Sequence, residues 1–282
     1  MHLAIKKSIL LLVLLTGMQW CRCQVNCRIF TDSSHIKACR LYNASDSFLQ
    51  GSRKAQQYLD SAIRICPDFA EAWREISVAY LKRGDFFTWR AYMDKAVDLK
   101  PYPFLGVRGW CRFKFLRDYE GALNDLQKFD TISNFHPAYS GDGNYHLYIV
   151  MALCERELGN YPQALHYFSL GIDSMLSQQG QSWVGFSDYL HRAVTKMRMK
   201  DYEGALSDLS NQIKKYDNFA EIYYYQGLIH SIMHHEKEAL TDLEKAKALV
   251  SSGHHLSDIY CELPDEVFIT DIEDAISQIK KL

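Results

Sequence analysis

Apolar side chains recur along the chain at the spacing of α-helices. One group, spaced three and four residues apart, forms a helix face: Trp73, Ile76 and Tyr80. A second group repeats that spacing: Trp89, Met93 and Ala96. Gly84 and Asp85 interrupt the pattern between them, and Pro101 ends the second helix. The pattern predicts a helical hairpin, and because one hairpin cannot bury its own apolar face, it predicts that neighbouring hairpins stack.

The chain also contains internal repeats. A nine-residue segment, Asp-Tyr-Glu-Gly-Ala-Leu-Asn-Asp-Leu at 118–126, returns almost unchanged at 201–209. A finer period of thirty-four residues separates two further pairs, Pro67 with Pro101 and Ala205 with Ala239. This alternation of large, aliphatic, small and aromatic residues in one helix, with an alanine in its partner, resembles the tetratricopeptide repeat family. The resemblance implies an all-α fold, a right-handed α-solenoid of tetratricopeptide helical hairpins with a C-terminal capping helix.

The repeat register predicts how the chain is organised. The array covers 36–253 with about six hairpins, the first of them degenerate, after an N-terminal segment at 24–35. Residues 254–282 are predicted to cap the last hairpin through a helix whose apolar face is Ile272, Ala275, Ile276 and Ile279. Insertions near 134–144 and 178–186 carry four aromatic side chains, Phe135, Tyr139, Trp183 and Phe186. These insertions either form a binding surface or act as spacers between hairpins.

The first twenty-three residues resemble a secretory signal peptide. Two lysines precede a compact apolar run, Ile9 to Leu15, which is far shorter than the roughly 20 residues of a membrane-spanning helix. Cleavage is expected between Cys23 and Gln24, which predicts an exported bacterial protein, periplasmic or secreted, without a stable membrane span. A buried N-terminal helix is one alternative, disfavoured because the segment is not amphipathic. Lipoprotein processing is another, disfavoured by the large residues before Cys21.

Composition and charge exclude one class of partner and suggest one disulfide. The 282 residues carry 32 Lys and Arg against 34 Asp and Glu, a net charge of −2, so the chain lacks the basic excess of a nucleic-acid-binding protein. In an oxidising compartment, Cys27 and Cys39 can close a short loop that pins the N-terminal segment, although spacing alone does not fix cysteine pairing.

The chain shows no sequence motif of an enzyme and none that implies a cofactor. G-x-S-x-G, the P-loop and G-x-G-x-x-G do not occur. The densest group of potential metal ligands is His230, His234 and His235, of which the first two stand one helical turn apart. No third ligand follows at a typical spacing, and packed or surface histidines are the alternative. We predict a protein that is not an enzyme, and keep as the alternative function a metal-binding or redox protein that uses this histidine cluster or the cysteines.

The family resemblance further implies a binding surface. In tetratricopeptide proteins the first helix of each hairpin lines a concave groove, and the matching positions here are Lys82, Phe104, Val107, Lys114, Phe115, Ile149, Arg156, Leu190, Arg198 and Tyr224. Such a groove is apolar with a basic stripe, which suits a protein or peptide partner that is extended, apolar and acidic. The alternative is that the apolar members pack against adjacent hairpins. The predicted function is a non-enzymatic interaction scaffold or adaptor in the cell envelope.

Overall fold

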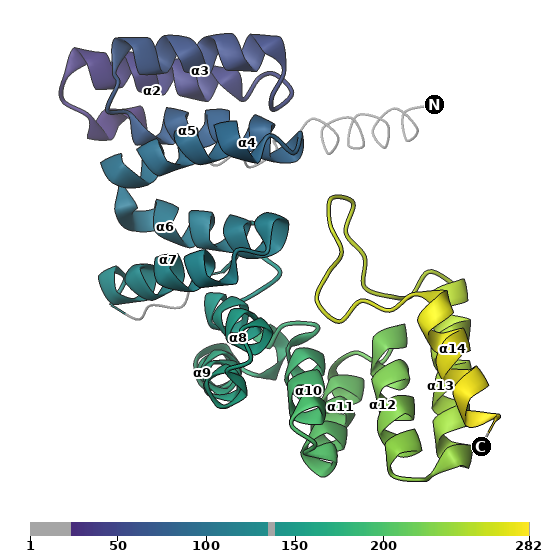
Figure 1. The fold of residues 1–282 in the computed structure, drawn as a ribbon. Coiled ribbons are helices and arrows are strands. Elements are labelled where there is room, and N and C mark those ends of the chain that lie inside the picture. The colour runs from purple at the N-terminus through teal and green to yellow at the C-terminus, as the bar shows by residue number, and fades with distance from the viewer. Residues whose placement is uncertain (1–23, 135–138, 282) are drawn as a thin grey trace, which may run out of the picture. The chain divides into compact units, whose positions relative to one another are not determined.

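The computed structural model describes residues 24–134 and 139–281, and this part of the chain is all-α (Figure 1). It contains thirteen α-helices and three short helical turns, and its one isolated β-bridge joins Tyr139 to His146. The predicted fold of paired helical hairpins is therefore confirmed. The predicted signal peptide at 1–23 and Phe135 of the first insertion lie outside the described residues. None of the described helices is both long and apolar enough to cross a membrane.

The chain divides into two compact units, and the first unit ends at Leu99. Its helices form two hairpins, α2 (Ser33–Ser45) with α3 (Arg53–Ile65) and α4 (Ala70–Lys82) with α5 (Phe86–Leu99). A short turn, η1 (Cys27–Ile29), precedes α2, and a disulfide joins Cys27 to Cys39. The largest side chains buried in this unit are Trp89, Phe69, Leu59, Ile76 and Met93.

The second unit begins at Lys100 and contains four more hairpins and a final helix. The hairpins are α6 (Pro101–Cys111) with α7 (Tyr119–Ile132), α8 (Leu147–Glu157) with α9 (Tyr161–Gln179), α10 (Asp188–Arg198) with α11 (Tyr202–Lys215), and α12 (Ala220–Ile232) with α13 (Glu236–Ser251). Two short turns, η2 (Arg112–Leu116) and η3 (Gln181–Trp183), follow α6 and α9. The final helix, α14 (Ile269–Ile279), packs on α13 and buries the predicted apolar face of Ile272, Ala275, Ile276 and Ile279.

Five hairpins turn between their two helices through one residue in the left-handed conformation. These residues are Gly84, Arg117, Gly159, Lys200 and His234, with φ angles of 76°, 53°, 83°, 65° and 61°. A left-handed residue after a helix redirects the chain, so that the next helix begins almost at once. The conformation costs a residue with a side chain about 1–2 kcal/mol, which glycine avoids. His234 therefore has a structural place in the fold, as the turn residue between α12 and α13.

Two glycines mark the closest approach of paired helices, and they reveal a difference in spacing between two hairpins. A Cβ atom added at either glycine would lie 2.8 Å from a leucine Cγ of the partner helix, for Gly109 with Leu126 and Gly227 with Leu243. The positions are equivalent, yet the following alanine comes thirteen residues later in one hairpin and twelve in the other, at Ala122 and Ala239. The extra residue is absorbed by η2, a π-helical turn at the end of α6.

Candidate functional site

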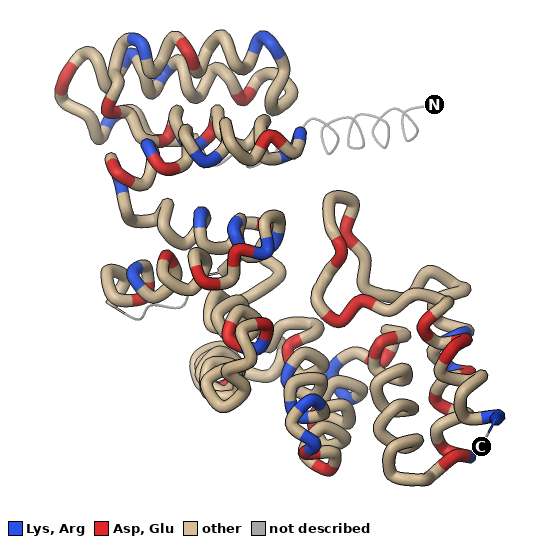
Figure 2. Tube along the Cα trace, in the orientation of Figure 1, with Lys and Arg blue, Asp and Glu red and all other residues tan. Residues whose placement is uncertain are grey.

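A long loop, residues 252–268, connects α13 with α14 and is called the C-terminal loop below (Figure 1). Both of its ends are fixed to the start of α12. The buried carboxylate of Glu221 accepts the backbone N–H of Leu256 at 2.9 Å and that of Val267 at 3.3 Å. The backbone N–H of Ala220 donates to the carbonyl of His254 at 2.9 Å. The loop contains four acidic residues and no Lys or Arg, as its red and tan trace shows in Figure 2.

The first acidic contact of the C-terminal loop is with η2. Lys114 Nζ lies 2.8 Å from Asp258 Oδ2 and 2.9 Å from Asp142 Oδ2, and the Lys114 side chain is only 7% exposed. Burial by itself would lower the pKa of Lys114, but the two carboxylates outweigh it and raise that pKa. Phe115 extends the contact, because its ring meets the Tyr260 ring edge-on at a centroid distance of 6.4 Å. Two carboxylates therefore balance the charge of Lys114 in a contact that is largely shielded from water.

The second acidic contact is deeper and joins the C-terminal loop to α8 and α10. Asp265 Oδ2 lies 2.8 Å from Arg156 Nη1 and 2.6 Å from His191 Nδ1. The side chains of all three residues are 2% exposed or less. Burial would raise the pKa of Asp265, but Arg156 and His191 outweigh this effect and hold the pKa well below its usual range. Asp265 is thus ionised, and it satisfies the charge of a buried arginine.

Two further ion pairs lie at the edges of this contact, where water competes. Arg117 Nη2 is 3.2 Å from Glu262 Oε2, with both side chains more than half exposed. Arg198 Nη1 is 3.1 Å from Glu157 Oε1, which also accepts from Arg156 Nε at 2.9 Å. Exposed pairs of this kind contribute about 0–1 kcal/mol each, so neither adds much to stability. Only the pair of Arg117 with Glu262 involves the C-terminal loop, since Arg198 and Glu157 belong to α10 and α8.

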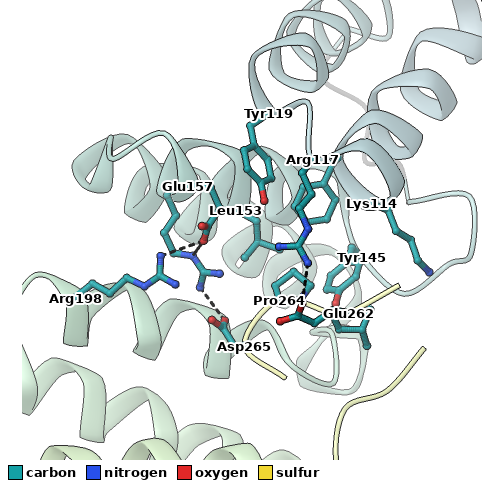
Figure 3. A pocket seen from close by; sticks show the side chains of 13 residues that line it. Lys114, Arg117, Tyr119, Tyr145, Leu153, Glu157, Arg198, Glu262, Pro264 and Asp265 are labelled. Atoms are coloured by element: carbon teal, nitrogen blue, oxygen red, sulfur yellow. Dashed lines mark hydrogen bonds and ion pairs between the residues drawn. The ribbon is translucent and has the colours of Figure 1, made fainter. Parts of the chain in front are cut away.

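A pocket of about 160 Å³ remains between the C-terminal loop and the helices (Figure 3). Its apolar lining comes from Phe113, Leu153, Leu263 and Pro264. In Figure 3, the Arg117–Glu262 and Arg198–Glu157 pairs stand at its border. The pocket therefore combines apolar walls with four basic side chains, each of which is paired with a carboxylate.

The predicted groove residues fall into three groups. Lys114, Arg156 and Arg198 line the pocket, and Phe115 packs on the loop. Phe104, Ile149 and Leu190 are at most 6% exposed and belong to the packing between helices, while Val107 and Tyr224 are half-buried. Lys82 lies in the first unit, where its Nζ donates to Gln50 Oε1 at 2.8 Å. Three of the apolar members are thus buried between helices, and the basic members of the second unit line one pocket.

The two insertions differ in their contribution. The first insertion supplies Asp142, which pairs with Lys114, and Tyr139, whose backbone bridges to His146. In the second insertion Phe186 packs against Phe219, with ring centroids 5.7 Å apart, whereas Trp183 is 56% exposed. The first insertion therefore contributes to the candidate site.

The histidine cluster takes a structural place. His230 Nδ1 lies 2.8 Å from Asp242 Oδ2, His234 forms the left-handed turn, and the rings of His230 and His235 are 6.1 Å apart between centroids. These three histidines are not among the groups with metal-binding geometry in the described residues. His230 and His234 thus have structural contacts of their own, and the metal-binding alternative at this cluster stays a prediction.

Sequence reasoning missed the acidic residues that complete the site. Asp258, Glu262 and Asp265 lie within a segment that the sequence assigned to a cap, and His191 lies on a buried helix face. The sequence nevertheless contains one signal that points to this contact. The loop has acids spaced four and three residues apart and no basic residue, while the predicted groove has about one basic residue per hairpin.

Comparisons with known proteins define the class of fold. No model of a protein family matches the sequence. Tetratricopeptide repeat protein 36 of Danio rerio is 34% identical over 99 residues, which cover 34% of this chain and 49% of that protein. The chain therefore spans about half the length of this curated relative.

Solved structures extend the comparison over most of the chain. The Cut9–Hcn1 hetero-tetramer of APC/C superposes with a TM-score of 0.60 at 14% identity, over 86% of this chain and 42% of that one. PilF of Pseudomonas aeruginosa gives 0.59 at 15% identity, over 78% and 95%. YrrB, a tetratricopeptide repeat protein with an unusual peptide-binding site, gives 0.54 at 15% identity, over 79% and 98%. This chain has the tetratricopeptide-type fold, in which stacked helical hairpins form extended surfaces.

Proposed function

We propose that this chain is a protein-interaction scaffold whose second unit binds an extended, apolar and acidic segment of a partner protein. The observation that carries the proposal is that the chain's own acidic loop already occupies the basic surface. Asp258 and Asp265 neutralise Lys114 and Arg156, and Glu262 faces Arg117. A segment that supplies the same charges at the same spacing satisfies this surface equally well.

The C-terminal loop also indicates the apolar character of the partner. Between its acids stand Ile259, Tyr260 and Leu263, and Tyr260 contacts Phe115 while Leu263 lines the pocket. A partner segment with acids four and three residues apart, and with aromatic or aliphatic residues between them, fits this surface by burial as well as by charge.

The same contacts make the C-terminal loop a competitor of the partner. A partner can bind only in the fraction of molecules whose loop has left the surface, and its apparent affinity falls by that fraction. The loop is held at both ends by Glu221, so its centre can leave while its ends stay attached. We therefore propose that binding exchanges an internal acidic segment for an external one.

The test uses a fluorescent peptide with the sequence of residues 254–268, carrying Cys261→Ser, as a model of the partner. Its affinity is measured at low salt for the wild type and for a loop variant, Asp258→Asn with Glu262→Gln. The variant should bind the peptide about tenfold more tightly, because its own loop competes less. Asp265 is left in place, since its removal would leave the buried charge of Arg156 without a partner.

Two charge reversals in the loop variant then locate the binding surface. Lys114→Glu with Arg117→Glu should weaken binding by about threefold to tenfold, as expected for two pairs worth some tenths of a kcal/mol or more each. The matched control, Lys247→Glu with Lys280→Glu, reverses two lysines that pair with Glu273 and Glu244 outside the pocket. Equal binding by all variants, or equal losses in both reversals, would refute the proposed surface.

We further propose that the chain acts in an exported, oxidising compartment, periplasmic or secreted. The disulfide between Cys27 and Cys39 supports this, since disulfides persist in such compartments and are rare in the cytosol. Protein isolated from its native host should begin at or near Gln24. Recovery of an N-terminus at Met1 would overturn the proposal.

A further inference from the structure

In the first unit, an imidazole, a thiol and a carboxylate that could each bind a metal ion lie close together. We propose that His35, Cys66 and Asp68 bind a divalent cation of the zinc type. Their ligand atoms all lie within 4.8 Å of one another. His35 Nε2 is 3.7 Å from Asp68 Oδ1, and Cys66 Sγ is 2.9 Å from the same oxygen. Zinc ligands bind about 2.0–2.3 Å from the ion, so three atoms with these separations can surround it after small side-chain adjustments.

The backbone holds the three ligands in place without the ion. His35 lies in the first turn of α2, Cys66 is the C-cap of α3, and Asp68 follows Pro67 in the connection to α4. The backbone N–H of Phe69 donates to the carbonyl of Cys66 at 3.1 Å and closes the turn that carries Cys66 and Asp68. A site formed by helix ends and a closed turn loses little freedom when it binds an ion.

The imidazole of His35 is fixed in orientation by its neighbours. Its ring stacks on Phe30 with centroids 5.3 Å apart, and it meets Phe69 edge-on at 6.5 Å. Asp32 Oδ2 lies 2.9 Å from His35 Nδ1, while Asp32 Oδ1 accepts the His35 backbone N–H at 2.9 Å. The Asp32 carboxylate therefore stands beside Nδ1, on the other side of the ring from Nε2, and it leaves Nε2 facing Asp68.

The donor set selects the kind of ion and the chemistry of binding. One imidazole nitrogen, one sulfur and one carboxylate oxygen suit zinc better than magnesium or calcium, which prefer oxygen alone. Cys66 now donates its thiol proton towards Asp68, so a sulfur–zinc bond forms as that proton is released to solvent. The Asp68 side chain is 63% exposed, which leaves room for water as the fourth ligand. No electron transfer is involved.

A bound ion would link the start of α2 to the connection between α3 and α4. It would therefore tie the first hairpin to the connection that leads into the second. A similar thiol–carboxylate contact, Cys261 with Asp258 at 3.8 Å, lies in the C-terminal loop but is not among the metal-binding groups of the described residues. That contact provides a matched control.

The test is a titration of the purified full chain, without a polyhistidine tag and with the disulfide intact, by Co²⁺ alone. We expect one ion per chain, a thiolate-to-cobalt charge-transfer absorption, and release of about one proton per ion. Zn²⁺ should displace Co²⁺ and raise the thermal unfolding midpoint of the wild type. Cys66→Ser should abolish the charge-transfer absorption, while Cys261→Ser should leave it unchanged.

Three further variants separate ligands from their support. His35→Gln and Asp68→Asn should each weaken Co²⁺ binding by at least about tenfold, and Asp32→Asn by about 10–100-fold through the orientation of the imidazole. Metal-free unfolding midpoints within about 2 °C of the wild type would show that these variants fold. Absence of the charge-transfer absorption, or its persistence in Cys66→Ser, would overturn the proposal. Because this site lies in the first unit, its failure leaves the proposed peptide surface of the second unit untouched.

Discussion

The hairpins α6–α7 and α10–α11 carry nearly the same sequence at their turns but differ in what they contact. In both, an aspartate caps the second helix by accepting a glycine N–H at 3.0 Å, in the pairs Asp118–Gly121 and Asp201–Gly204. In both, a buried aspartate binds two cations. Asp125 binds Arg108 of α6 and Arg112 of η2, and Asp208 binds Arg192 and Lys196 of α10. The shared motif therefore encodes the same internal contacts twice.

The hairpin α6–α7 is one residue longer than the hairpin α10–α11 between these paired side chains. Arg108 lies seventeen residues before its aspartate, whereas Arg192 lies sixteen before its own. The π-helical turn η2 takes up the extra residue, and Lys114 and Phe115 of that turn contact the C-terminal loop. In α10 the chain stays α-helical up to Arg198. An added residue has thus been absorbed without disturbing the hairpin, and side chains of the resulting turn belong to the candidate site.

The largest expected effect comes from removing one residue from each hairpin. Deletion of Leu116 should convert the π-helical turn into a regular helix and leave the second unit folded. Deletion of Met197 from α10, which has no extra residue, should rotate the turn out of register and cost more than about 4 kcal/mol. Denaturant unfolding followed by circular dichroism measures both. Equal losses in the two deletions would mean that η2 does not contain an insertion.

The next effect tests the contacts that both hairpins share. Asp125→Ala and Asp208→Ala should each cost about 3–5 kcal/mol, because each leaves two partly buried cations without their carboxylate. The control Asp274→Ala, on the exposed side of α14, should change stability by less than about 0.5 kcal/mol. Chemical denaturation midpoints give these values. A large inequality between Asp125 and Asp208 would contradict the equivalence of the two hairpins.

A third difference between the two hairpins depends on pH, because the first helix of each hairpin begins with a different residue. α6 begins with Pro101, whereas α10 begins with Asp188, whose pKa burial raises to about 6. An unfolded aspartate titrates near 3.9, so between about pH 4 and 6 the unfolded chain loses a proton that the folded chain keeps. Stability from this group is complete below about pH 4 and is lost as the pH rises to about 6.

Asp188→Asn isolates that contribution. The unfolding free energy of the wild type, relative to the variant, should fall by about 2 kcal/mol between pH 4 and pH 6, most of the total of about 3 kcal/mol that a shift of about two pKa units gives. His146, whose pKa burial lowers to about 4, titrates in the same range but is present in both proteins and cancels in the difference. Parallel stability curves would show that Asp188 is not held in a dry environment.

The smallest expected effect is at the turns of the two hairpins, where Arg117 and Lys200 adopt a left-handed backbone conformation. Lys200→Gly should stabilise the second unit by up to about 1 kcal/mol, because glycine adopts this conformation without strain. Arg117→Gly should gain less, since it also removes the exposed contact with Glu262, worth up to about 1 kcal/mol. Thermal unfolding of both variants gives the difference. Equal gains would mean that Arg117 contributes nothing to holding the C-terminal loop.

Much of the fold could be predicted from sequence because its signals are local. The helix faces follow from spacing, as Ile76 and Met93 show, and the capping face of α14 was read directly from its isoleucines. The π-helical turn was not visible, because one extra residue in a helix leaves no mark when only the alanines of the second helices are aligned. The basic candidates Lys114 and Arg156 followed from the family register, but their acidic partners in the C-terminal loop lie more than one hundred residues away in sequence. Which surface a long loop covers depends on the assembled hairpins, and no local pattern encodes it.

The central claim is that the C-terminal loop occupies the surface that binds a partner. The most direct measurement is amide hydrogen exchange in the isotope-labelled chain, before and after saturation with the unlabelled peptide of residues 254–268. The amides to follow are those of Tyr260 and Leu263, which donate to Asp258 and Glu266 within the loop. The account predicts that these amides exchange faster when the peptide binds, because it displaces the centre of the loop, while Leu256 and Val267 stay bound to Glu221. If the peptide saturates the chain and the amides of Tyr260 and Leu263 exchange as slowly as before, the central claim is contradicted.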